Sequence, residues 1–233
     1  SGLTETSGDL TAYPLHGQDS FYSSQAAMEA AGFTFITGSA NADDVALTFD
    51  PGPTWTGIQF LGSSPTSANW FLNTNGGVGF AQGGQTTTYR FGDSVTNTSS
   101  IDLYVSWWSQ DTETRLAGWK EITFDGQQWL VVRADMKVPY NNESGGFPVE
   151  AWFSENGEIS VRYGTSVGGA TFTVGSNRQA ICGLGSIYAG TTTPFTSLTS
   201  SGGYAVTYGS KLGYQVSIDQ LVDVDTTTTP PAD

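Results

Sequence analysis

The chain has 233 residues, of which 37% are hydrophobic and 13% aromatic, enough apolar bulk for one large core. Its 22 acidic and 8 basic side chains give a net charge of −14. Because such a surface repels phosphate, we expect no nucleic-acid partner and no binding to anionic membrane faces. The sequence also contains no apolar run near the length that spans a bilayer, so we expect no membrane insertion.

Residue usage favours strands over helices. Glycine occurs 30 times and Thr and Ser are abundant, whereas helix-favouring residues are scarce. The single cysteine, Cys182, excludes an intramolecular disulfide and a cysteine-based metal cage. It lies in an apolar run, where a cysteine usually fills a core. We therefore predict an all-β protein that carries no cofactor.

The two ends of the chain differ from its middle. Residues 1–20 are polar and show no period, which predicts an irregular N-terminal arm. They lack the basic and apolar regions of a signal peptide, so we expect either a mature chain or one that has lost its initiator methionine. Residues 223–233 are rich in Thr and Pro and have nothing to bury, which predicts an extended C-terminal tail. Residues 21–222 then form one domain, and we expect neighbouring chains in an assembly to hold both tails.

One short helix is expected over residues 23–32. Ser23 and Ser24 suit an N-cap, an alanine-rich body follows, and Gly32 is a stop signal. A helix of about two turns is marginal in isolation, so it must pack against another element.

Short strand candidates separated by turn signals fill most of the remaining chain. Before residue 130 they cover residues 33–37, 45–49, 58–61, 70–72, 78–80, 86–91, 101–107 and 121–124. After residue 163 they cover residues 170–174, 180–184, 204–208 and 214–218. Turn-forming pairs such as Gly83-Gly84 and Asp125-Gly126 lie between them. This regular spacing predicts an antiparallel β-sandwich, such as a jelly roll, or a barrel.

Residues 128–163 predict three consecutive antiparallel strands around which we expect the sandwich to be built. In each strand apolar residues alternate with others, which is the period of a half-buried strand. The sets expected to face inward are Leu130, Val132, Ala134, Met136 and Val138; Phe147, Val149, Ala151 and Phe153; and Ile159, Val161 and Tyr163. The Asn156-Gly157 pair between the last two strands predicts a hairpin with a type I′ turn.

Charged residues lie on the opposite face of these strands. Arg133, Asp135 and Glu150 share that face with Trp152. Such a set is typical of cross-strand charge pairing on a solvated sheet. The alternative is a glycosidase, in which two carboxylates lie on one sheet face across a sugar groove lined by aromatic rings.

Residues 70–185 resemble the nidogen-type (NIDO) β-sandwich module in the order of their features. The matching pieces are NTNGGVGF at 73–80, LYVSWWSQDTETR at 103–115, VVRADMKVPYNN at 131–142, FPVEAWFSENGEISVRYG at 147–164 and the apolar run at 180–185. The cysteines of the animal extracellular versions are missing, and residues 1–69 have no counterpart. The resemblance implies a nidogen-like sandwich in an extracellular, cell-surface or phage virion protein.

Catalysis and metal binding have few candidates in the sequence. His16 is the only histidine, and a Ser-His-Asp or Cys-His site would need it. Nothing in its sequence neighbourhood orients a base, so we expect a structural or solvent-exposed role. Acidic residues could supply oxygen ligands to calcium, but their spacing matches no recognised calcium loop. These residues are Asp43, Asp44, Asp111, Glu113, Asp223 and Asp225.

Aromatic residues are the remaining candidates for recognition, with 7 Trp and 10 Tyr in the chain. Large rings in strands more often fill cores or subunit contacts than bind sugars. Trp108, Trp119 and Trp152, if exposed together, would form an interaction patch. Such a patch would favour adhesion or assembly.

These features predict a non-enzymatic structural or adhesion protein. We expect a virion component of a tailed phage, such as a capsid decoration, fibre or tail protein, that assembles through its sandwich surface and tails. Its partners would be other virion or surface proteins, further copies of itself in a homo-oligomer, and a host-surface glycan. One alternative is a carbohydrate-binding or adhesive module of a secreted bacterial surface protein, with an extracellular or cell-surface location. The other is the β-sandwich glycosidase.

Overall fold

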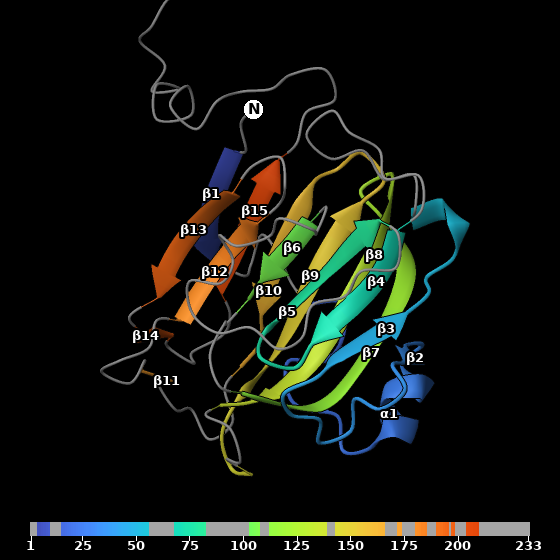
Figure 1. The fold of residues 1–233 in the computed structure, drawn as a ribbon, viewed down its shortest axis with the longest axis vertical. Coiled ribbons are helices and arrows are strands. Elements are labelled where there is room, and N and C mark those ends of the chain that lie inside the picture. The colour runs from blue at the N-terminus through green and yellow to red at the C-terminus, as the bar shows by residue number, and fades with distance from the viewer. Residues whose placement is uncertain are drawn as a thin grey trace, which may run out of the picture.

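Two antiparallel sheets stack against each other in the computed structural model of the chain (Figure 1). The structure describes residues 4–9, 15–55, 68–82, 103–107, 112–138, 143–165, 172–173, 180–185, 190–195, 197–198 and 204–209. The prediction of an all-β sandwich with one short helix is confirmed.

The seven-stranded sheet receives both of its edges from the N-terminal part of the chain. Its order is β1-β15-β10-β9-β8-β7-β2, and all neighbours are antiparallel. The strands are β1 (Thr4–Asp9), β15 (Tyr204–Gly209), β10 (Ile159–Tyr163), β9 (Phe147–Ser154), β8 (Gln127–Lys137), β7 (Glu113–Phe124) and β2 (Thr34–Phe35). The edge strands β1 and β2 are therefore close in sequence but far apart in the sheet.

The six-stranded sheet forms the other layer, with the order β13-β12-β6-β5-β4-β3. Its strands are β13 (Gly190–Phe195), β12 (Ala180–Gly185), β6 (Leu103–Ser106), β5 (Gly77–Gln82), β4 (Ala68–Asn73) and β3 (Ala46–Phe49). The other elements are the pair β11 (Phe172–Thr173) and β14 (Ser197–Leu198), the helix α1 (Gln25–Ala30) and the 3-10 turn η1 (Pro53–Trp55). In Figure 1, β4, β5 and β6 lie over β8, β9 and β10.

A hydrophobic core fills the space between the sheets. The residues of β8, β9 and β10 that were expected to face inward are all buried there. They meet aromatic side chains of the opposite sheet, and the ring of Trp70 lies edge-on to Phe153 with centroids 4.9 Å apart. Because burial of one such side chain contributes roughly 1.5–3 kcal/mol, this core is a large source of stability.

Strand β7 is much longer than the sequence predicts. It runs from Glu113 to Phe124, whereas alternation indicated only residues 121–124. A β-bulge between Thr114 and Leu116 shifts the pairing with β8, which breaks the simple alternation of polar and apolar residues. The predicted strands at 58–61, 86–91 and 214–218 and the predicted tail at 223–233 lie outside the described residues.

Two hairpin turns next to β8 and β9 use different backbone conformations. Asp125 and Gly126 have φ angles of 49° and 72°, as a type I′ turn requires between β7 and β8. Between β9 and β10 only Gly157 has a positive φ, of 86°, so the type I′ turn predicted at Asn156-Gly157 is wrong. There the Ser154 N–H donates to the Glu158 carbonyl and the Gly157 N–H to the Ser154 carbonyl, which is a three-residue loop ending in a left-handed glycine.

The N-terminal residues belong to the sandwich and do not form a separate irregular arm. Residues 4–9 form the edge strand β1, and residues 15–22, which we call the N-terminal segment, lie against the outer face of the seven-stranded sheet. A second hydrophobic cluster covers that face: Tyr22, Met28, Phe33, Leu116, Trp129, Val131 and Trp152. The expected boundary at residue 20 therefore does not separate two structural units.

Helix α1 begins with the predicted serine cap. The Ser24 hydroxyl accepts a hydrogen bond from the Ala27 N–H at 3.2 Å, and Gly32 follows the helix with a φ of 87°. We expect Ser24→Ala to lower the free energy of unfolding by about 1 kcal/mol, because an N–H of the first turn loses its acceptor. Urea denaturation measures the loss. The matched control is Ser23→Ala, and equal losses in the two variants would contradict the capping role.

Candidate functional site

Three ionised side chains on the outer face of β8 and β9 form the best-built polar site in the described residues. Arg133 and Asp135 lie two residues apart on β8, and Glu150 pairs with Arg133 across to β9. We call these three residues the clamp. Each has 0% exposure, so the expectation that they lie on a solvated face is wrong. The N-terminal segment covers them.

Glu150 holds the start of the N-terminal segment by its main chain. One carboxylate oxygen accepts from the His16 N–H at 2.7 Å and from the Trp152 indole N–H at 2.9 Å. The other accepts from the Gly17 N–H at 2.7 Å. A carboxylate that receives this many donors is satisfied without water.

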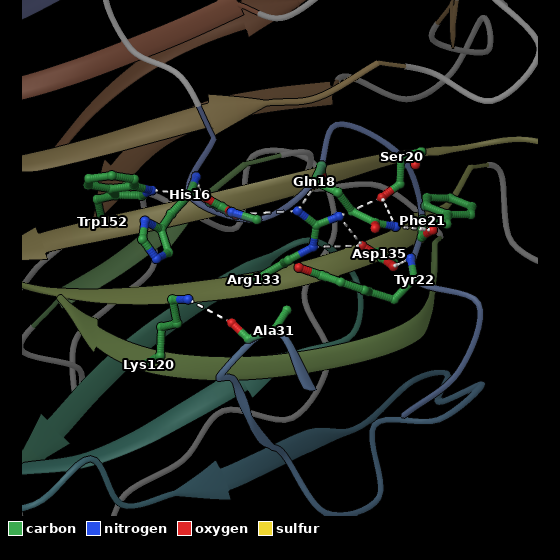
Figure 2. Close-up of polar contacts among 12 residues, drawn as sticks. His16, Gln18, Ser20, Phe21, Tyr22, Ala31, Lys120, Arg133, Asp135 and Trp152 are labelled. Atoms are coloured by element: carbon green, nitrogen blue, oxygen red, sulfur yellow. Dashed lines mark hydrogen bonds and ion pairs between the residues drawn. The ribbon is translucent and has the colours of Figure 1, made fainter. Parts of the chain in front are cut away.

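Arg133 and Asp135 hold the rest of the segment, as Figure 2 shows. Arg133 donates to the carbonyls of Gln18 at 2.7 Å and Ser20 at 2.8 Å. It also pairs with Asp135 at 3.0 Å and with Glu150 at 3.3 Å. Asp135 accepts from the Tyr22 N–H at 2.7 Å. The planar guanidinium suits this task because its five donors point in fixed directions.

The clamp carries two carboxylates against one guanidinium, so it holds a surplus negative charge away from water. Burial raises the pKa of Asp135 to about 6, although the Arg133 guanidinium and the Tyr22 N–H oppose the rise. The face of the Tyr22 ring lies over Arg133, with 4.6 Å between the guanidinium carbon and the ring centroid. This contact adds a cation–π attraction to the hydrogen bonds.

Gly17 is the point of closest approach between the segment and the clamp. A Cβ there would lie 2.6 Å from a terminal nitrogen of Arg133 and 3.0 Å from a carboxylate oxygen of Glu150. We expect Gly17→Ala to lower the free energy of unfolding by about 1–3 kcal/mol, since the segment must move off its bonding partners. Urea denaturation tests this, with Ser20→Ala in the exposed part of the same segment as the control. A neutral Gly17→Ala would show that the segment is loosely held.

The predicted patch of Trp108, Trp119 and Trp152 does not form an exposed cluster in the described residues. Trp152 has 1% exposure and contacts Trp129, with ring centroids 5.8 Å apart. Trp119 is half-buried on the opposite face of the sheet, where it packs against the core between the sheets. Trp108 lies outside the described residues.

Trp152 is instead the centre of a buried aromatic and cationic stack. The guanidinium of Arg162 lies 3.4 Å from the centroid of the Trp152 ring. Phe124, which is 40% exposed, contacts the same ring edge-on at 5.5 Å. The stack joins the β7–β8 turn to β9 and β10, so it has a structural role next to the clamp.

His16 contributes its main chain to the site and leaves its side chain exposed. Its ring lies edge-on to Trp152 at 6.1 Å. Partial burial lowers the pKa of His16, and the positive charge of Lys120 lowers it further. The imidazole is therefore mostly neutral near pH 7. Figure 2 shows Lys120 engaged elsewhere, because its ammonium donates to the Ala31 carbonyl at 2.8 Å.

The acidic residues considered for calcium have other partners where the structure describes them. Asp44 accepts from the Asn75 side chain at 2.8 Å, and Glu113 pairs with the buried Lys137 at 2.7 Å. No group of three or more potential ligands that could hold a metal occurs among the described residues. Asp111, Asp223 and Asp225 lie outside them. Within the same part of the chain, no helix is long and apolar enough to cross a membrane.

Comparisons with known proteins do not assign the chain to a family. No protein-family model, no curated protein and no solved structure matches the chain. The resemblance to nidogen-type sandwiches stays a prediction from sequence motifs, and the site is interpreted from its own geometry.

Proposed function

We propose that this protein is a non-enzymatic structural protein that works by assembling with copies of itself and with other proteins. The observation that carries the proposal is that the clamp residues bind the chain's own N-terminal segment. The clamp side chains form hydrogen bonds with main-chain groups of the N-terminal segment. Chemistry on a substrate would need at least one of these carboxylates to face an open site.

The glycosidase alternative has less support at this face. It needs two carboxylates on either side of a groove that admits a sugar. Between Asp135 and Glu150 lies Arg133, and above them lies the N-terminal segment. In this conformation the space that a sugar would need is filled by the chain itself.

For the setting we propose the virion of a tailed phage, where the chain would serve as a capsid decoration, fibre or tail protein. The support is compositional: 22 acidic against 8 basic residues, one cysteine, and strands rich in Thr, Gly and Ser. A strongly acidic exterior keeps a protein soluble at high local concentration. A fold without disulfides needs no oxidising compartment.

Light scattering on the full chain across a range of concentrations tests the proposal. We expect oligomers that increase with concentration, no hydrolysis of a panel of glycosides, and ordered assemblies by electron microscopy. A monomer at every concentration would overturn the structural role. A monomer that also binds defined sugars on a glycan array would favour the carbohydrate-binding module, and glycoside turnover would favour the enzyme.

A further inference from the structure

The clamp has the features of a receptor for a peptide main chain. Its three side chains bond the N–H groups of residues 16, 17 and 22 and the carbonyls of residues 18 and 20. The outward side chains of His16, Gln18 and Ser20 are exposed. Recognition therefore depends on the backbone, on the lack of a Cβ at Gly17 and on the ring of Tyr22.

The N-terminal segment can leave this receptor without opening the core between the sheets. Among the residues whose burial the structure describes, the first residue of that core in chain order is Ile36, so residues 15–22 contribute nothing to it. Among the described strands, β1 is bonded only to β15. The only cysteine of the chain is Cys182, so no disulfide within the chain fixes the segment. Ser23 and Ser24, both exposed, connect the segment to α1, which has its own contacts with the sheet.

We infer that in the assembled protein the clamp is occupied by residues 15–22 of a second copy, with β1 of that copy paired to β15. The inference rests on the proposed function, because exchange requires a protein that assembles. The same hydrogen bonds form whether the segment comes from its own chain or from a neighbour, so an exchanged dimer is self-complementary. A short linker favours the chain's own segment, and the high local concentration in an assembly offsets that advantage.

Disulfide trapping in the full chain distinguishes the two arrangements. Thr6 of β1 lies directly opposite Thr207 of β15. In a Cys182→Ala background, Thr6→Cys is placed on one copy and Thr207→Cys on a second copy of different size, and the two are co-expressed. Each copy then has a single thiol, so only an exchanged strand can join them in register. The matched control is Thr123→Cys with Gln128→Cys, which are opposite each other in the β7–β8 hairpin and cannot meet through this exchange.

We expect the Thr6/Thr207 mixture to give roughly tenfold or more cross-linked unequal pairs than the Thr123/Gln128 mixture. A chain that carries both Thr6→Cys and Thr207→Cys reports the cross-link within one copy. If light scattering shows oligomers but the cross-link forms only within this chain, exchange is overturned and the assembly function stands. If the protein is monomeric and the cross-link lies within one chain, both proposals fail.

Discussion

Replacement of Arg133 by methionine is expected to lower the free energy of unfolding by about 3–5 kcal/mol. The change removes the cation but leaves Asp135 and Glu150 at 0% exposure. Two buried carboxylates then face each other without a positive charge between them, and the carbonyls of Gln18 and Ser20 lose their bonds to the guanidinium. Urea denaturation at neutral pH measures the loss.

Two further variants identify the cause of that loss. Arg115→Met removes an arginine that is only half-buried, with its guanidinium 5.6 Å from the Phe21 ring, so it should cost about 1 kcal/mol or less. Arg133→Lys keeps the positive charge but lacks the planar set of guanidinium donors. Its loss in free energy of unfolding should therefore lie between the losses of the other two variants. If Arg133→Met and Arg115→Met lower the free energy of unfolding by the same amount, the clamp does not hold the N-terminal segment.

The inner face of the seven-stranded sheet could be predicted from the sequence because its signal is local. Leu130, Val132 and Ala134 alternate along one strand, and the requirement to bury them fixes which face meets the other sheet. The helix cap at Ser24 is equally local, since donor and acceptor lie three residues apart.

The outer face could not be predicted in the same way, because its partner is distant and offers main-chain groups. His16 and Glu150 are 134 positions apart, and the N–H of one residue resembles that of any other. One signal was available. Trp129, Val131 and Trp152 are also on the outer face, and all three are buried. Large apolar residues on the second face of a strand indicate that something covers it.

Burial changes what a cross-strand pair of charged residues contributes to stability. Alternation placed Arg133 and Glu150 on one face correctly, and cross-strand pairing between them is present. On a solvated sheet such a pair contributes little to stability. Under the N-terminal segment the same pair also satisfies backbone groups that would otherwise be buried without partners.

The pH dependence of stability should contain a contribution of about 3 kcal/mol from Asp135. Its pKa is raised from 3.8 to about 6 in the folded protein, chiefly because burial disfavours the charged form. The folded state therefore binds the proton more tightly than the unfolded state does. This contribution is fully present below about pH 4 and is lost as the pH rises through about 6.

Comparison with Asp135→Asn isolates this contribution, because the other carboxylates titrate in both proteins. We expect the wild-type advantage in free energy of unfolding to be larger at pH 4 than at pH 7.5, by about 2–3 kcal/mol. Carbon NMR of the aspartate carboxyl groups measures the titration directly, and the Asp135 signal should have its midpoint near 6. A midpoint below the ordinary aspartate value would mean that Arg133 and the Tyr22 N–H outweigh burial. The clamp would then be most stable near neutral pH, and the N-terminal segment would loosen in acid.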